Sequence, residues 1–258
     1  GLQPSHILAM QGPFSKELNI AMLNTERTLE RVLRIARSLP ETERQYFDFA
    51  QQHPADCDKN SPAIGVQLSA LVIDLRETIA TEEECKRGRA VPYAAAKRIC
   101  KRTVECNSHR PSTQGAWIDA DGKQCLCDGM TGVRLNSPFK LTVAPEPECG
   151  ERFDLDAVIR PVRLNSVALK SPSAALHAKI KSDRAEYKAS GRPKYESFVS
   201  MYDFGAGLPL VNAEYLLDLL ELFPDCEIYA HDNPLYPIYF KSASGEAVLC
   251  PIRKSEKG

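Results

Sequence analysis

The sequence has 258 residues, of which 43% are hydrophobic and 26% are charged, and its net charge at pH 7 is −1. This length allows one or two domains with a buried core, and the composition is that of a globular protein rather than a disordered or fibrous one. No run of about 18 apolar residues occurs, so we expect no transmembrane helix and no membrane partner.

The small net charge hides a strong segregation of charge along the chain. Residues 1–84 carry 8 basic against 13 acidic side chains, and residues 195–258 carry 4 against 10. Residues 85–110 carry 8 basic against 1 acidic, and residues 177–194 carry 6 against 2. Two basic segments therefore lie between acidic ends.

The chain contains nine cysteines, an odd number, with no C-x-x-C pair. This pattern favours reduced thiols in a cytoplasmic protein over a disulfide scaffold. One constellation could bind zinc, namely Cys106, His109, Cys125 and Cys127. The Cys-x-Cys spacing is not that of a zinc knuckle, and free cysteines are commonly small buried side chains, so we expect no metal and no cofactor.

The N-terminal third is predicted to be a helical module. We expect residues 1–21 to be a tail outside the fold; one interpretation is an added segment, because the chain opens with Gly rather than Met. Within the module, residues 22–84, amphipathic patterns predict helices at Thr25–Leu39 and Glu41–Gln52. A third helix is expected to open at Ser61-Pro62, since serine caps and proline suits the first turn.

The third helix carries a long apolar stripe that needs a cover, either from the other two helices or from another chain. The stripe consists of Ile64, Leu68, Leu71, Val72, Leu75 and Ile79. A charged, exposed linker at Glu82-Glu83-Glu84 then marks the boundary to a second domain at residues 85–258.

The second domain is predicted to be α+β. A helix at Pro92–Thr103 is followed by strand-forming segments at 116–120 and Gln124–Cys127, and by the pair Arg134-Leu135. Residues 138–150 read as extended chain. Helices are then expected at Phe153–Val162 and Ser171–Ala189, and a strand at Tyr195–Phe204.

The C-terminal fifth reads as one helix followed by three antiparallel strands. Asn212 caps the helix and Pro224 ends it. Strands are expected at Glu227–Ala230, Tyr236–Lys241 and Ala247–Ile252. The helix presents a wide apolar face, so it should lie across this meander.

These residues resemble a known family. The phrases Val211-Asn212, Tyr215-Leu216-Leu217-Asp218 and the ending Val248-Leu249-Cys250-Pro251-Ile252-Arg253 are similar to the last unit of bacterial sliding clamps, the β subunit of DNA polymerase III. The earlier helix with its Asp121-Gly122, Asp128-Gly129 and Arg134-Leu135 elements resembles a preceding unit of the same kind. The resemblance spans Val91 to Lys254.

The resemblance implies one DNA-clamp-like domain built of two helix-plus-antiparallel-sheet units and preceded by the helical module. Clamps carry three such domains in each chain, whereas this chain has room for one. A role in DNA replication, an origin in a phage or mobile element, and a homo-oligomer would follow. The resemblance also implies a groove for partner peptides at the ending, with Leu249, Pro251, Ile252 and Arg253.

The helix at Pro92–Thr103 places four cations on one face, namely Lys97, Arg98, Lys101 and Arg102. In a clamp, helices of this kind line the DNA hole, and long cations contact phosphates without reading sequence. The second basic segment adds Lys179, Lys181 and Arg184. These residues are candidates for contact with double-stranded DNA or with another copy of the chain; the alternative is a solvated helix face.

The last helix places four carboxylates on one face, namely Glu214, Asp218, Glu221 and Asp225. Such a face would repel phosphates. It could instead dock a basic partner, or the basic helix of a neighbouring copy.

No enzymatic motif is present. The sequence contains no G-x-S-x-G, H-E-x-x-H or phosphate-loop pattern. Asp119, Asp121 and Asp128 lie near a hairpin, where such residues usually make the turn. Two hypotheses lead: a non-enzymatic, clamp-fold, DNA-associated scaffold, or a clamp-fold interaction factor that binds, recruits or inhibits a host or phage protein without encircling DNA. A hydrolase or nuclease remains only as a residual third.

Overall fold

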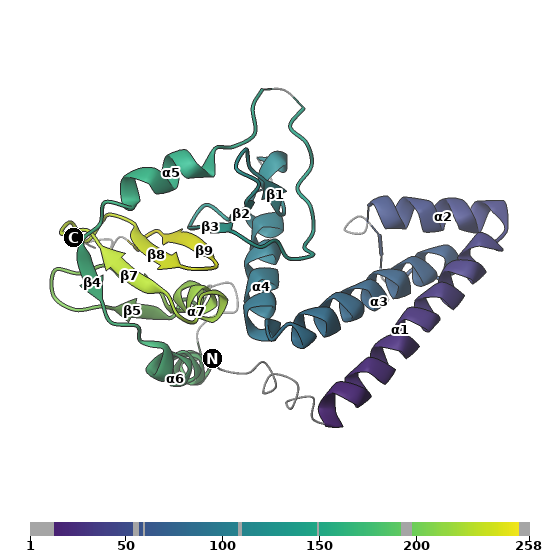
Figure 1. Cartoon of the computed structure of the whole chain (residues 1–258), viewed down its shortest axis with the longest axis horizontal. Helices are drawn as coiled ribbons and strands as arrows, with labels where there is room; N and C mark the ends of the chain where they lie inside the picture. The colour runs from purple at the N-terminus through teal and green to yellow at the C-terminus, as the bar shows by residue number, and fades with distance from the viewer. Residues whose placement is uncertain are drawn as a thin grey trace, which may run out of the picture. The chain divides into compact units, whose positions relative to one another are not determined.

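The computed structural model describes residues 13–53, 57–58, 60–107, 110–148, 150–191 and 198–252 (Figure 1). The chain divides between Ala90 and Val91 into two compact units. The first is helical and the second combines helices with strands, so the α+β class expected from the sequence is confirmed.

The described part of the first unit consists of α1 (Pro13–Arg37), α2 (Glu41–Gln52) and α3 (Ile64–Lys86). Its buried centre is formed by Val32, Ala36, Phe47 and Val72, with Leu29, Leu33, Leu39, Leu68 and Leu75 packed around them. Helices α1 and α2 thus cover the middle of the apolar stripe on α3. Leu71 and Ile64 remain exposed.

Two predictions about this unit are wrong. Helix α1 begins at Pro13, so residues 13–21 are helical rather than a tail. Helix α3 continues through the segment predicted to be an exposed linker, and Glu84 there is only 3% exposed. Glu84 accepts hydrogen bonds from Arg87 at 2.5 Å and Arg89 at 2.7 Å. Glu84 is thus paired with two arginines that follow it in the chain.

A glycine sets how closely α2 and α3 pack. A Cβ atom at Gly65 would lie 2.0 Å from the carbonyl oxygen of Glu43 and 2.8 Å from the amide nitrogen of Phe47. Only a residue without a side chain lets the two backbones approach this far.

The second unit contains two successive groups of one helix and three strands. The first group is α4 (Ala90–Cys106), the short 3-10 helix η3 (Pro111–Thr113), β1 (Trp117–Ile118), β2 (Gln124–Cys127) and β3 (Thr131–Leu135). The second group is α7 (Ala213–Leu222), β7 (Glu227–Ala230), β8 (Ile238–Ser242) and β9 (Gly245–Leu249). Together with β4 (Val167–Leu169), the strands form one antiparallel sheet in the order β1-β2-β3-β9-β8-β7-β4.

The two groups occupy equivalent places about the centre of this sheet. Strands β3 and β9 pair there, with Val133 opposite Ala247. Leu126 of β2 lies opposite Val133, just as Phe240 of β8 lies opposite Ala247. Each group thus consists of one helix followed by three antiparallel strands, and the strands of both groups belong to one sheet.

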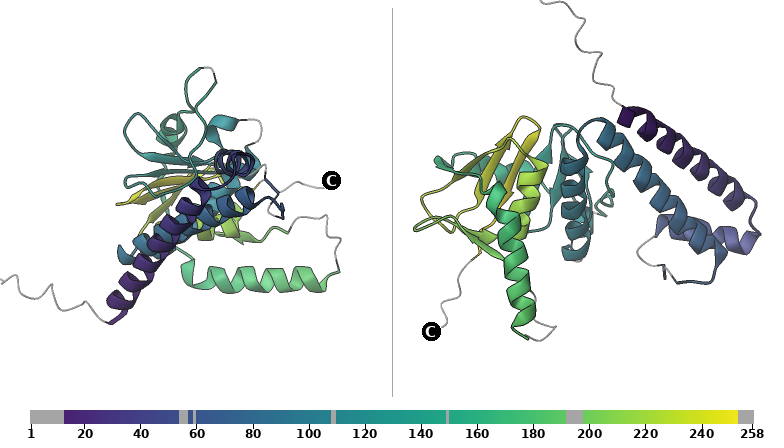
Figure 2. Two further views of the ribbon diagram at one scale, coloured as in Figure 1. Left: turned by 90° about the vertical axis from the view of Figure 1, so that its right-hand side faces the viewer. Right: turned by 90° about the horizontal axis from the view of Figure 1, so that it is seen from below.

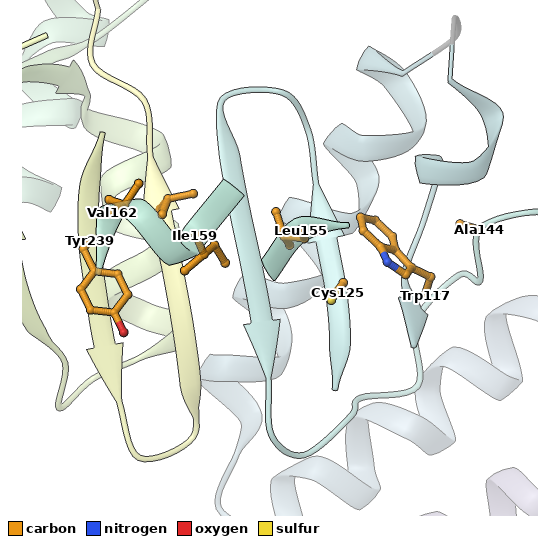
Figure 3. Close-up of a cluster of buried hydrophobic side chains, with 8 residues drawn as sticks. Trp117, Cys125, Ala144, Leu155, Ile159, Val162 and Tyr239 are labelled. Atoms are coloured by element: carbon orange, nitrogen blue, oxygen red, sulfur yellow. The ribbon is translucent and has the colours of Figure 1, made fainter. Parts of the chain in front are cut away.

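Side chains alternate along each strand and so project from both faces of the sheet. Helices cover both faces. Helix α5 (Leu155–Val162) lies on one face and α7 on the other (Figure 1). Figure 3 shows the cluster under α5, in which Leu155 and Ile159 lie in a row between Tyr239 and Trp117. Leu155 packs against Gly132, and a Cβ atom at Gly132 would lie 2.9 Å from Cδ1 of Leu155.

The remaining elements lie between the two groups. They are α6 (Ser173–Ala189) and a two-stranded sheet of β5 (Met201–Asp203) and β6 (Leu210–Asn212). Strand β5 covers only the end of the strand predicted at Tyr195–Phe204, and residues 192–197 lie outside the described residues. Figure 2 shows α6 alongside α7, and the two helices are in contact.

Among the described helices, none combines the length and the apolar character that crossing a membrane would require.

Candidate functional site

The basic helix α4 and the acidic helix α7 are joined by ion pairs. Arg98 donates to Asp218 at 2.6 Å and also to Glu221. Arg102 donates from Nε to Asp128 at 2.9 Å and from Nη1 to Asp218. One carboxylate, that of Asp218, thus binds both arginines.

Arg102 is the more buried of the two arginines. Its side chain is 17% exposed, and its guanidinium carbon lies 4.3 Å from the ring centroid of Tyr215. Burial alone would lower the pKa of Arg102, but the hydrogen bonds to Asp218 and Asp128 raise it above its usual value. Arg102 is therefore a charged group held between two carboxylates and an aromatic ring.

The four cations predicted to face DNA or a second copy have different surroundings. Arg98 and Arg102 bind carboxylates of the same chain. Lys97 lies over the ring of Tyr93 with its Nζ 5.7 Å from the centroid. Lys101 is 77% exposed and 3.7 Å from Glu105. Of the four, Lys101 extends furthest into solvent.

The prediction of an open acidic face on α7 is wrong. Asp218 is buried by the α4 arginines, and Glu214 accepts a hydrogen bond from Arg184 of α6 at 2.6 Å. Glu221 contacts Arg98 on one side and His177 of α6 at 3.1 Å on the other. Asp225, beyond the end of the helix, is exposed. Asp218, Glu221 and Glu214 have partners because α7 lies between two basic helices.

The second basic segment is only partly free to bind a partner. On α6, Lys179 pairs with Asp183 at 2.9 Å and Arg184 pairs with Glu214. Lys181 is exposed and has no carboxylate within ion-pair distance in the part of the chain that the structure describes.

The predicted peptide groove at the chain ending is only partly compatible with the structure. Strand β9 ends at Leu249 rather than at Ile252, and Leu249 is completely buried, so it cannot line an open groove. Pro251 and Ile252 are partly exposed, and the amide of Ile252 donates to the carbonyl of Leu210 at 2.7 Å. Arg253 lies outside the described residues.

The cysteines described by the structure are free thiols. Burial, together with the nearby Asp119 carboxylate, raises the pKa of Cys125 to about 12, and burial raises the pKa of Cys127. Both pKa shifts favour the protonated thiol. No group of three potential ligands in the described residues has the geometry of a metal site; Cys106 is exposed and His109 is not described.

The turn roles predicted for two aspartates are confirmed. Oδ1 of Asp119 accepts from the amides of Asp121 and Lys123, both at 2.9 Å. Oδ1 of Asp128 accepts from the amides of Met130 and Thr131. In both residues the second oxygen binds an arginine, Arg134 or Arg102, which the turn pattern alone did not indicate.

A buried arginine organises the face of the sheet beside α5. Arg134 of β3 is 1% exposed and donates to Asp119 at 2.8 Å and Asp121 at 2.7 Å. It also donates to Asp156 of α5 at 2.6 Å and Glu246 of β9 at 2.9 Å. These hydrogen bonds to charged acceptors offset the large free-energy cost of burying the Arg134 guanidinium.

The network continues through Arg163, just after α5. Arg163 donates to Glu246 at 2.7 Å and to Asp156 at 2.5 Å. Tyr239 donates to Glu246 at 3.1 Å, and burial together with that carboxylate raises the pKa of Tyr239 to about 12. These bonds hold α5 against the sheet.

Sequence reasoning missed this cluster, because the carboxylates come from the β1–β2 turn, α5 and β9, far apart along the chain. The only local signal is an arginine between Val133 and Leu135 in a strand with no other charged residue. A hollow of about 470 Å³ opens over the cluster.

No family model, curated protein or solved structure matches this chain. Its function is therefore argued from the geometry above.

Proposed function

We propose that this chain is a non-enzymatic, clamp-like accessory protein of phage or mobile-element DNA metabolism, which acts in the cytoplasm by binding a host or phage protein and does not encircle DNA. The two equivalent helix-plus-three-strand groups about the β3–β9 pair support the clamp-like part of this proposal.

The observation that favours a protein partner over DNA in this proposal is the pairing of the α4 arginines. A helix that lines a DNA channel needs cations free to contact phosphates. Here Arg98 and Arg102 bind Asp218 and Glu221, so phosphate contact would require breaking partly buried ion pairs.

The helical unit offers a surface suited to a protein partner. On α2, Tyr46 and Phe49 are each about half exposed and lie three residues apart, on one side of the helix. Ile35 of α1 and Ile64 of α3 are exposed to a similar degree. Exposed aromatic and aliphatic side chains are enriched at protein contacts.

The experiment is cross-linking mass spectrometry in the native host, with the wild type and a Tyr46→Ser, Phe49→Ser variant. We expect a reproducible partner cross-linked to the helical unit, lost in the variant. A matched control is Leu23→Ser, which removes an equally exposed apolar side chain from α1 and should retain the partner. Circular dichroism confirms that each variant is folded. Identical cross-links in all three proteins would contradict the proposal.

Duplex DNA is the second candidate, because Lys101 and Lys181 are exposed cations outside the α4–α7 ion pairs. Fluorescence anisotropy with a random-sequence duplex at rising salt tests it. If these lysines contact phosphates, Lys101→Gln with Lys181→Gln should lower the log–log salt slope by about two. Tight, salt-dependent binding of this kind would favour DNA over the protein proposal.

A further inference from the structure

The hollow over the Arg134 cluster has the dimensions of a small-molecule site. Its volume of about 470 Å³ lies within the range of roughly 300–1,000 Å³ that is usual for such sites. Its floor contains Arg134, Glu246 and Tyr239, all buried, and Asp156 and Arg163 line the side near α5. The floor is rigid because these groups are hydrogen-bonded to one another.

The charges of the floor are already satisfied. Glu246 accepts from Arg134, Arg163 and Tyr239. Asp156 accepts from Arg134 and Arg163 as well. Each carboxylate of the floor is therefore already paired with an arginine. A ligand that binds there would not have to neutralise an unpaired charge of the floor.

Two lysines also line this hollow, and neither belongs to the Arg134 cluster. Lys123, just before β2, is only partly exposed and has no carboxylate within ion-pair distance in the described part of the chain. Lys241 of β8 is exposed and forms a loose, exposed ion pair with Glu227, 3.7 Å away. A lysine ammonium is a compact point charge that binds phosphate well.

The two lysines come from different sides of the hollow. Strands β3 and β9 separate β2 from β8, so the two backbones are about 14 Å apart at the usual strand spacing. One phosphate would contact both lysines only if both side chains bent towards it. A molecule with an anionic group at each end fits this separation better.

Polar groups between the lysines can bind hydroxyls. Asp121 bonds to Arg134 through Oδ2 and is largely exposed, so its other oxygen can accept a hydrogen bond. Asn136 donates to the carbonyl of Ala243 at 2.9 Å, which leaves its amide oxygen as an acceptor. Ser242 adds a hydroxyl to the rim.

We propose that this hollow binds a small polyhydroxylated molecule with a phosphate at each end, of the sugar bisphosphate class. One phosphate contacts Lys123, the other contacts Lys241, and the hydroxyls between them donate to Asp121 and Asn136. The site is separate from the protein-binding surface proposed above, and neither proposal depends on the other.

Isothermal titration calorimetry of the full chain tests this site with fructose 1,6-bisphosphate, fructose 6-phosphate and fructose. We expect the bisphosphate to bind about tenfold more tightly than the monophosphate, because it makes one more charge-assisted contact, and fructose not to bind. Lys123→Gln or Lys241→Gln should each reduce bisphosphate affinity about tenfold, to that of the monophosphate.

Lys170→Gln is the control, since Lys170 is exposed and does not line the hollow. Its affinities should match the wild type. The melting temperatures of all three variants should change little, because the ion pair that one of these lysines forms, Lys241–Glu227, is exposed. Absence of phosphate binding to the wild type would overturn the proposal. Equal affinity for the bisphosphate and the monophosphate would do so too, as would an equal loss in the Lys170 variant.

Discussion

Asp218 of α7 accepts a hydrogen bond from Arg102 of α4, a residue 116 positions earlier in the chain, and the pair is largely buried. The same carboxylate binds Arg98. Two helices that the sequence suggests as a basic and an acidic docking surface are thus held together by those charges.

Replacing Asp218 should destabilise the second unit. Asp218→Asn preserves shape but leaves Arg102 with one charged partner fewer, so the free energy of unfolding should fall by about 3 kcal/mol. Urea denaturation measures this change. The control Glu105→Gln removes the carboxylate of the exposed pair with Lys101 and should cost no more than about 0.5 kcal/mol. Equal effects would mean that the buried pair contributes no more than an exposed one.

The cluster under α5 should make stability depend on acid pH. Hydrogen bonds from Arg160 and Arg163 lower the pKa of Asp156 to about 2, from an ordinary value of 3.8. Burial would raise the pKa of Glu246, but hydrogen bonding to Arg163 lowers it overall. Because the folded-state pKa values are depressed, this stabilisation is fully present above the ordinary values. It is lost as the pH falls towards 2.

Urea midpoints measured between about pH 7 and pH 2 test this sign. The wild type should lose stability progressively below about pH 5, and Asp156→Asn should show a shallower loss because it removes one of the titrating groups. Asp225→Asn, at an exposed site outside the cluster, is the matched control. A steeper acid loss in the Asp156 variant than in the wild type would contradict the assignment.

Gly65→Ala should loosen the helical unit. Alanine gains about 1 kcal/mol in helix propensity over glycine. Its methyl group, however, would overlap the backbone of Glu43. We expect a net loss of about 2 kcal/mol, together with faster amide hydrogen exchange in α2 and unchanged exchange in β3 and β9. Gln67→Ala, at an exposed position on the same helix, should remain within about 0.5 kcal/mol of the wild type.

The second unit should fold without the first. Residues 91–258 form one compact unit with its own buried sheet, so this fragment should give an α+β circular dichroism spectrum and a cooperative thermal transition. An unfolded fragment beside a folded full chain would show that the helical unit is needed for the core of the second.

Local patterns were sufficient for the elements whose causes are local. Helix α2 was predicted with the ends it has, because Pro40 precedes it and its apolar spacing is helical. The cap of α7 was predicted as well: Asn212 accepts from the amides of Glu214 and Tyr215. Strands β2 and β7 also have the predicted bounds. In each case the deciding interaction joins residues a few positions apart.

Only the tertiary structure decided what the charges do. The spacing of Arg98 and Arg102 shows that they share a face of α4, but it contains no information about Asp218, which approaches only when β3 and β9 pair. Strands β4 and β6, each three residues long, are too short for a periodic signal and are set by their neighbours. The Arg134 cluster likewise exists only after distant segments have been brought together by burial of the apolar residues between them. Charge patterns along a sequence identify ionic groups, whereas packing selects their partners.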